Sequence, residues 1–216
     1  MPYTDRSTKV QLMKPENDTK QKLLAAAMEL IWESSYGSVS VDDICTRAGV
    51  NKGSFYHAFK SKSDLAVAAF EDYWQTKRPI LDEIFSPQIP PLERLDRYCQ
   101  LIISDQREKQ RSFGKLLGCP FCSIGSELST QDEKIRQKAE QLSTRSQKYL
   151  ESLVRDLAAE GLIDLEEAPD LGREIFAYIV GALLQAKIEN SMTHLERLPH
   201  GVMRLLGLKR PSRAAA

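Results

Sequence analysis

Apolar residues recur at helical spacing in two short stretches within residues 41–59. In the first stretch Ile44 and Ala48 stand four positions apart, so they share one face of a helix. In the second stretch Phe55 and Phe59 share a face, while polar side chains occupy the opposite one. The pattern predicts two short helices that each pack through one side and expose the other.

Residues that begin and end helices stand at the borders of both stretches. Ser40 and Asp43 form a capping box that starts the first helix at Val41. Gly49 stands where a tight turn needs a positive φ, and Asn51 is a good N-cap for the second helix. Two helices joined by so short a glycine turn predict a helix-turn-helix, whose second helix can enter the major groove of DNA.

The remainder of the chain also shows helical periodicity, broken by proline and glycine. Asp18 and Gln21 predict a capping box for a helix that stops at Tyr36-Gly37. Pro79 should kink or end the helix that begins after Ser61. Further helices are expected from Leu92, in a short segment after Pro120, over residues 131–160, over residues 170–192, and at the end around residues 205–208.

These elements predict an all-α protein in three parts. Residues 1–17 have little periodicity and are expected to form a flexible N-terminal arm. Residues 18–64 are expected to form a three-helix helix-turn-helix DNA-binding domain. Residues 65–210 are expected to form a larger helical bundle for regulation, ligand binding and dimerisation. The proline-rich segment 86–91 more simply joins two helices of one body than two domains.

The helix expected over residues 170–192 is apolar around most of its circumference, so it needs two packing partners. One is the core of its own bundle. The other is either the same helix of a second subunit, with Leu205, Leu206 and Leu208 completing the contact, or a further part of a monomeric bundle. Specific DNA binding favours the dimer, because one short helix contacts too few bases.

Charge adds a local argument for DNA. The chain has 30 basic and 30 acidic residues, so its net charge gives no general attraction to nucleic acid. Between Ile44 and Ser63, however, the basic residues are accompanied by no acidic residue, and they are Arg47, Lys52, Lys60 and Lys62. Such a patch can neutralise phosphates. The alternative is an ordinary helical hairpin with a solvated basic face.

The expected partner is therefore a double-stranded DNA operator. Lys52 and His57 are candidates for contacts to base edges, and Ser40, Tyr56, Lys60 and Lys62 for contacts to phosphates. Gly53 would let the backbone approach the sugar-phosphate chain, because it has no side chain. The complete predicted set is Ser40, Asn51, Lys52, Gly53, Ser54, Tyr56, His57, Lys60 and Lys62.

Residues 40–65, which end Phe-Tyr-His-Ala-Phe-Lys-Ser-Lys-Ser-Asp-Leu, closely resemble the DNA-binding domain of the TetR family of transcriptional regulators. The resemblance extends back through residues 19–33. It implies an all-helical homodimer, usually a repressor that a small ligand releases from its operator. Two positions depart from the family pattern. Cys45 stands where a small apolar residue such as alanine is common, and Ala58 where many members have an aromatic residue or histidine.

The segment Cys119-Pro120-Phe121-Cys122 is the one most suggestive of chemistry. It resembles the redox pair of glutaredoxins, but their fold needs a β-strand before the motif, and this region is predicted to be helical. Zinc is disfavoured because further ligands at suitable spacing are missing. Pro120 at the first helical position would place Cys119 at a helix N-terminus, where the helix dipole and Lys115 favour the thiolate.

Gly118-Cys119 and the following Ser-Glu-Leu of residues 126–128 are similar to a Gly-Cys signature in one C-terminal subgroup of the family. Members of that subgroup include sensors of electrophiles or oxidants that react through cysteine. Cys119 and Cys122 are therefore candidate sensors. The alternative is that both thiols are small apolar groups packed in a tight turn.

A ligand pocket in the bundle is the competing means of control. We expect its walls to combine aromatic bulk with a few polar edges, drawn from Trp74, Cys99, Ile103, Phe113, Phe121, Tyr149 and Phe176. The alternative is that each of these residues is packed in the hydrophobic core and lines no pocket. The class of the small-molecule effector stays open, because no repeated charge accompanies the apolar residues.

Several other classes are disfavoured by composition. No run of eighteen apolar residues occurs, and the first eighteen residues contain no hydrophobic segment of a signal peptide. We therefore expect a cytoplasmic protein without a membrane partner, with reduced thiols, no metal and no cofactor. Rival functions are a helical thiol redox enzyme that uses Cys119 and Cys122, and a protein-interaction module that binds no DNA. Neither explains the basic second helix, so no enzymatic activity is expected.

Overall fold

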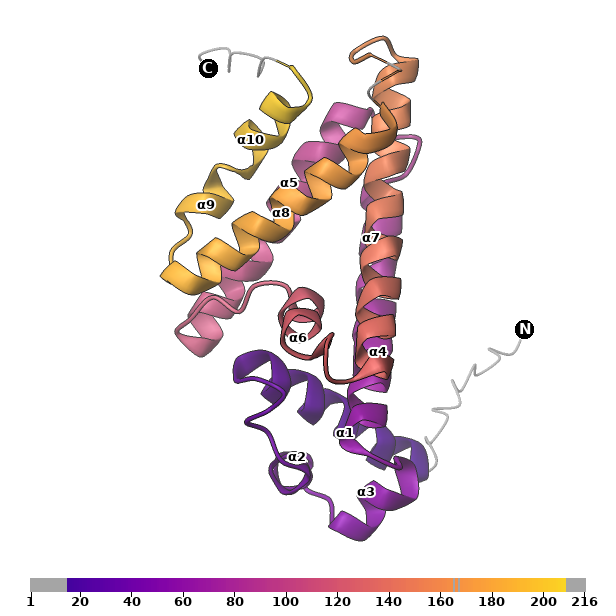
Figure 1. Ribbon diagram of the computed structural model, residues 1–216, viewed down its shortest axis with the longest axis vertical. Coiled ribbons are helices and arrows are strands. Elements are labelled where there is room, and N and C mark those ends of the chain that lie inside the picture. The colour runs from indigo at the N-terminus through magenta and orange to yellow at the C-terminus, as the bar shows by residue number, and fades with distance from the viewer. Residues whose placement is uncertain (1–14, 165, 167, 209–216) are drawn as a thin grey trace, which may run out of the picture.

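The computed structural model describes residues 15–164, 166 and 168–208, and these residues form helices and no strand (Figure 1). This confirms the all-α class. The described helices are α1 (Pro15–Glu33), α2 (Val41–Ala48), α3 (Lys52–Ala58), α4 (Lys62–Ile84), α5 (Pro91–Phe113), α6 (Pro120–Leu128), α7 (Glu133–Ala159), α8 (Ala168–Glu189), α9 (Thr193–Glu196) and α10 (Leu198–Leu205).

The capping residues of the helix-turn-helix act as the sequence predicts. The Ser40 side chain accepts the amide of Asp43, and the Asp43 carboxylate accepts the amide of Ser40, which completes the capping box of α2. Gly49 ends α2 in the left-handed conformation at φ 66°, where a side chain would be strained. Asn51 caps α3 by accepting the amide of Ser54. The turn between α2 and α3 is therefore set by local chemistry.

The start of α1 differs from the prediction. The helix begins at Pro15, so the predicted capping box at Asp18 and Gln21 does not form. The Asp18 carboxylate instead pairs with Lys22 one turn later at 2.6 Å. The Gln21 amide donates to Asp72 of α4 at 3.0 Å, which draws it away from the helix end. Most of the predicted flexible arm, residues 1–14, lies outside the described residues.

Helix α4 connects the two predicted domains without a break. Its first turn contains the predicted boundary between residues 64 and 65, and the helix continues through Pro79 to Ile84. Pro79 is exposed. The carbonyl that loses its helical partner there can therefore bind water, which explains why the proline does not end the helix.

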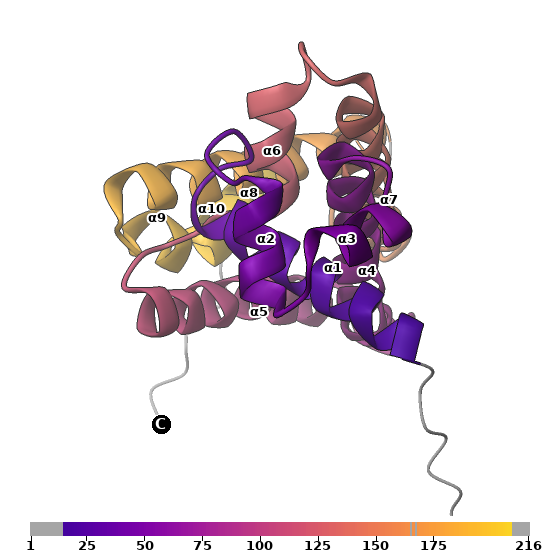
Figure 2. The same ribbon diagram turned by 90° about the horizontal axis from the view of Figure 1, so that it is seen from below.

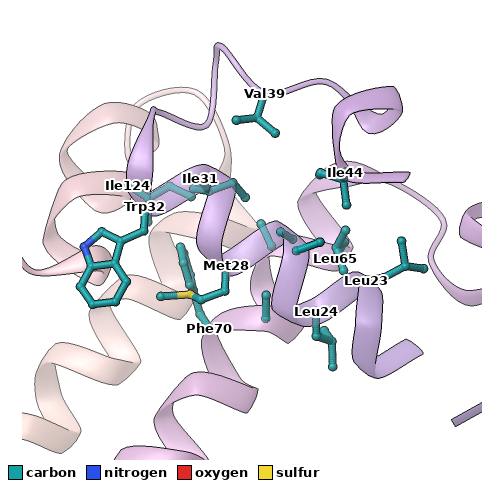
Figure 3. Close-up of a cluster of buried hydrophobic side chains, with 14 of the residues drawn as sticks. Leu23, Leu24, Met28, Ile31, Trp32, Val39, Ile44, Leu65, Phe70 and Ile124 are labelled. Carbon is teal, nitrogen blue, oxygen red and sulfur yellow. The ribbon is translucent and has the colours of Figure 1, made fainter. Parts of the chain in front are cut away.

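The core of the DNA-binding end includes side chains from the bundle. Figure 3 shows Leu23 and Ile31 of α1, Ile44 of α2 and Leu65 of α4 in one buried cluster, which Ile124 of α6 joins. A second cluster lies between α5, α7, α8 and α10. The helix-turn-helix is therefore packed onto the bundle through α6 as well as through α4.

The molecule is elongated, with the helix-turn-helix at one end (Figure 1). Helices α4 and α7 run along its length, α8 packs on α7, and α6 lies between the helix-turn-helix and the rest. Figure 2 looks at the helix-turn-helix end, with α1, α2 and α3 in front of the bundle. Across the ranges that the structure describes, no helix combines the length and apolar character needed to cross a membrane.

Candidate functional site

Helix α3 presents a polar surface to solvent at the end of the molecule. Phe55 is fully buried, while Tyr56 next to it is 55% exposed. The Tyr56 ring packs edge-on against the Phe55 ring, with 5.1 Å between the ring centres. Of the predicted DNA contacts, Ser54 is half-buried, and those exposed are Ser40, Asn51, Lys52, Gly53, Tyr56, His57 and Lys60. The face that the sequence predicts for DNA is therefore accessible.

Some of these residues also shape α3 and α2. Ser40 Oγ donates to the Asp43 carboxylate at 2.6 Å, and Asn51 Oδ1 accepts the Ser54 amide at 2.8 Å. A Cβ at position 53 would lie 3.2 Å from Asn51 Oδ1. Glycine at this position therefore leaves room for the cap of α3, in addition to any close approach of DNA.

The basic patch is partly balanced by carboxylates from outside its own segment. Lys52 Nζ lies 2.9 Å from Asp42, and Arg47 lies 3.0 Å from Glu29 of α1. The hydrogen bond that the Lys52 ammonium donates to Asp42 raises the pKa of Lys52 above its usual value. Exposed ion pairs of this kind are weak, so a phosphate can replace the carboxylate.

Lys62 does not point toward solvent as a phosphate contact requires. Its ammonium donates to the carbonyls of Tyr36 at 2.9 Å and Val39 at 2.8 Å, and lies 3.9 Å from the centre of the Tyr36 ring. Burial lowers the pKa of Lys62, with an opposing effect from Glu127. Its contacts indicate that Lys62 holds the loop before α2, whereas the sequence analysis predicted a contact to phosphate.

A shallow groove separates α3 from the N-terminal part of α1. It is lined by Thr19, Lys20, Asn51, Gly53, Ser54, His57 and Ala58. Lys20 Nζ lies 5.9 Å from the centre of the Phe59 ring. The sequence prediction missed Lys20, although a lysine near the start of the first amphipathic helix is a signal that points to it.

A cavity of about 870 Å³, counting its open mouth, lies among the helices of the bundle. Trp32 of α1 is part of its wall together with residues of α4, α5, α6, α7 and α8. Three of the predicted wall residues, Trp74, Phe121 and Phe176, line it, as do Cys119 and Cys122. Part of the predicted pocket wall and both predicted sensor thiols therefore line one cavity.

Four predicted wall residues lie elsewhere. Cys99 and Ile103 are buried in the second core cluster, because that face of α5 turns toward α7 and α10. Phe113 packs against the core of the DNA-binding end. Tyr149 lines a separate outer cleft, where its hydroxyl donates to Asp82.

The cavity contains polar groups that the sequence prediction did not include. Lys77 and Asp105 form an ion pair at 2.9 Å on its wall. Gln106, only 3% exposed, accepts the amide of Gly118 at 2.9 Å and donates to its carbonyl at 3.2 Å. Tyr73 and Tyr98 also line the wall. Only the tertiary packing shows that these residues face a cavity.

The thiols of Cys119 and Cys122 differ in acidity. Cys119 is the N-cap residue of α6. The neighbouring Cys122 thiol lowers the pKa of Cys119, and the amides of Cys122 and Phe121 lower it further, against the opposing effect of burial. A hydrogen bond to Cys119, together with burial, raises the pKa of Cys122. Cys119 is therefore the more acidic thiol of the pair.

The family follows from comparison with known proteins. Residues 23–69 match the model of bacterial regulatory proteins of the tetR family, and residues 91–202 match the tetracyclin repressor-like C-terminal domain. The chain belongs to the TetR family. The structure places the two matched TetR segments at the helix-turn-helix end and in the bundle that surrounds the cavity.

Individual TetR-type regulators are similar over most of their length. The HTH-type transcriptional regulator in the lacX 3' region of Lactococcus lactis subsp. lactis is 32% identical over 83% of this chain and 88% of its own. The transcriptional repressor NemR of Escherichia coli K12 is 27% identical over 84% and 90%. The crystal structure of a TetR regulatory protein from Rhodobacter sphaeroides aligns with a TM-score of 0.77 and 29% identity over 87% and 98%.

These matches decide between the rival classes of function. The chain is a DNA-binding transcriptional regulator and not an enzyme. The predicted alternative of a thiol redox enzyme is therefore excluded. TetR regulators bind operator DNA as dimers and respond to small-molecule effectors. The likeness to a Gly-Cys subgroup stays a prediction.

Proposed function

We propose that this TetR regulator is a cytoplasmic repressor that binds an inverted-repeat operator as a dimer and leaves it when a small electrophile reacts at Cys119. The relative NemR, 27% identical, bears the name of a transcriptional repressor, which supports repression over activation. The effector acts at a cavity of the bundle whose wall includes Trp32 of α1.

One observation carries this proposal. The more acidic thiol, Cys119, lines the cavity whose wall also includes Trp32 of α1. An electrophile that enters the cavity meets a thiol whose lowered pKa increases the reactive thiolate fraction. The adduct then occupies space beside a helix of the DNA-binding domain. By contrast, burial raises the pKa values of Cys45 and Cys99, which slows their reaction.

The proposed DNA contacts lie on the exposed side of α3 and beside it. Lys52 and His57 are our candidates for base edges in the major groove, and Tyr56, Lys60 and Lys20 for phosphates. Binding of two successive major grooves requires two α3 helices about 34 Å apart or slightly more. A second protomer supplies the other helix.

The proposed dimer face is an exposed apolar stripe on α8. Leu184 is 52% exposed and Ile188 is 67% exposed, and the smaller Ala177 and Gly181 are exposed on the same side of the helix. Leu205 of α10 is also exposed, whereas Leu206 is buried within the protomer. Large exposed apolar side chains at helical spacing favour an isologous contact between copies of α8.

The experiment compares DNA affinity before and after alkylation of the thiols. Fluorescence anisotropy would give the dissociation constant of a duplex obtained by selection, with the protein untreated or treated with iodoacetamide. We expect alkylation to weaken binding by about 5–150-fold, the usual range of coupling between two sites. Cys119→Ser should abolish the effect, and the control Cys99→Ser should retain it. Equal weakening in Cys119→Ser would refute control through this thiol.

A further inference from the structure

Glu127, near the C-terminal end of α6, binds the DNA-binding domain through its carboxylate. Oε1 accepts the amide of Gly37 at 2.8 Å, and Oε2 accepts the amide of Tyr36 at 3.2 Å. A Cβ at position 37 would lie 3.2 Å from Oε1, so glycine lets the carboxylate come close. Hydrogen bonds to an ionised acceptor are stronger than neutral ones. This contact joins residues about ninety positions apart in sequence.

Lys62 holds the same loop by donating hydrogen bonds to backbone carbonyls of the loop. Its ammonium donates to Tyr36 and Val39, so the peptide groups of the loop meet a cation on one side and the Glu127 carboxylate on the other. The next residue along the chain, Ser40, is the N-cap of α2. The two charged side chains together therefore fix the point at which α2 begins.

The opposite end of α6 is anchored at the cavity. Gly118, with φ 68°, is held at both its amide and its carbonyl by Gln106. The Trp32 indole donates to the carbonyls of Leu117 and Gly118, each at 3.2 Å. Cys119 follows as the N-cap of the helix. A group attached to its sulfur therefore acts on the first turn of α6.

The helix between these two ends is short and packed. Its nine residues extend over roughly 14 Å at 1.5 Å per residue. Ile124, halfway along, is buried in the core of the DNA-binding end (Figure 3). A displacement of the first turn cannot be absorbed by bending over so short a length, so the last turn moves with it.

We propose that Glu127 is a positioning residue that transmits the state of the cavity to the helix-turn-helix through the loop before α2. The inference rests on the proposed function, because it assumes that reaction at Cys119 weakens DNA binding. Loss of the carboxylate frees the loop from α6. The DNA-binding end then responds less to what happens at Cys119.

The test compares Glu127→Ala with the wild type and with Ser126→Ala, a control for an exposed neighbour whose hydroxyl donates within α6. Each protein's affinity for the selected duplex is measured before and after iodoacetamide treatment. The ratio of the dissociation constant after treatment to that before treatment should be the same in the wild type and the control. In Glu127→Ala this ratio should fall toward one. Glu127→Gln, which keeps a similar shape, should give an intermediate ratio and serves if the alanine variant fails to fold.

Hydrogen exchange at the Tyr36 and Gly37 amides provides a second measurement. Exchange should be slow in the wild type, faster after alkylation, and already fast and insensitive to alkylation in Glu127→Ala. A wild-type ratio of affinities in Glu127→Ala, or unchanged exchange at these amides, would overturn the role of Glu127. A ratio of one in the wild type would instead refute control through Cys119, and unchanged exchange in Glu127→Ala would still reject the positioning role.

Discussion

At the scale of single residues, three lysines around α3 carry the same charge but have different surroundings. Lys60 is exposed next to α3, Lys52 is exposed and paired with Asp42, and Lys62 is half-buried against backbone carbonyls. A cation contributes to DNA binding only if it can release its partner for a phosphate. Lys60 and Lys52 meet that condition. Lys62 does not, because its removal would take a donor away from the backbone carbonyls of Tyr36 and Val39.

Alanine substitutions of Lys60 and Lys62 distinguish a contact to DNA from a role in folding. We expect Lys60→Ala to weaken binding to all duplexes and to lower the slope of log affinity against log salt by about one. Lys62→Ala should leave that slope unchanged and cost about 1–3 kcal/mol of folding free energy through its lost hydrogen bonds. Anisotropy titrations at several salt concentrations and thermal unfolding measure the two effects. An unchanged slope in Lys60→Ala would remove it from the interface.

At the scale of elements, Glu71 joins α4 to α7. Its carboxylate accepts from Lys138 at 2.9 Å and from Arg145 at 2.8 Å, and Gln75 on its own helix donates to it at 2.6 Å. Burial opposes ionisation, but these hydrogen bonds prevail and lower the pKa of Glu71 to about 2. The charged form therefore stabilises the contact between the two long helices.

This shift predicts a pH dependence of stability. A carboxylate with a lowered folded pKa contributes stability above its unfolded pKa of 4.5 and loses it as pH falls toward the folded value of about 2. We expect Glu71→Gln to lower the melting temperature at pH 7, with a difference from wild type that shrinks between pH 4.5 and 2. Glu140→Gln, whose carboxylate pairs within α7, is the control. A difference independent of pH would contradict the assignment.

The elements also show what sequence can predict. The ends of α2 and α3 follow from Ser40, Gly49 and Asn51, since each cap involves residues at most four positions apart. The ion pair of Arg47 with Glu29 and the inward turn of Lys62 depend on how helices pack, so local patterns do not contain them. Only some of the cavity walls could be predicted, because they too depend on how the helices pack. Apolar spacing indicates a buried face but not whether a core or a cavity covers it.

At the scale of the whole molecule, function requires two copies of α3 at a fixed separation. The exposed stripe on α8 lies on the bundle, at a distance from the helix-turn-helix (Figure 1). Pairing through this stripe would leave both DNA-binding ends accessible. The short α6 would then let an adduct in each cavity change the position of each helix-turn-helix.

Disruption of the stripe should separate the protomers. We expect Ile188→Asp to form monomers at micromolar concentration in sedimentation velocity, because the charge would be desolvated within the apolar contact. Its affinity for the selected duplex should fall by about tenfold or more, since one helix contacts few bases. Leu162→Asp replaces an exposed leucine outside the stripe and should remain dimeric. A dimeric Ile188→Asp would place the interface elsewhere.

Selection of duplexes from a random pool, followed by sequencing, tests most directly whether α3 supports sequence-specific binding by a dimer. The wild type should enrich an inverted repeat whose half-sites lie about one helical turn apart, near 10 base pairs, or slightly more. His57→Ala should enrich the repeat less strongly, with relaxed preference at one position in each half. Failure to enrich any sequence over the input pool, or enrichment of a single half-site without symmetry, would contradict the account.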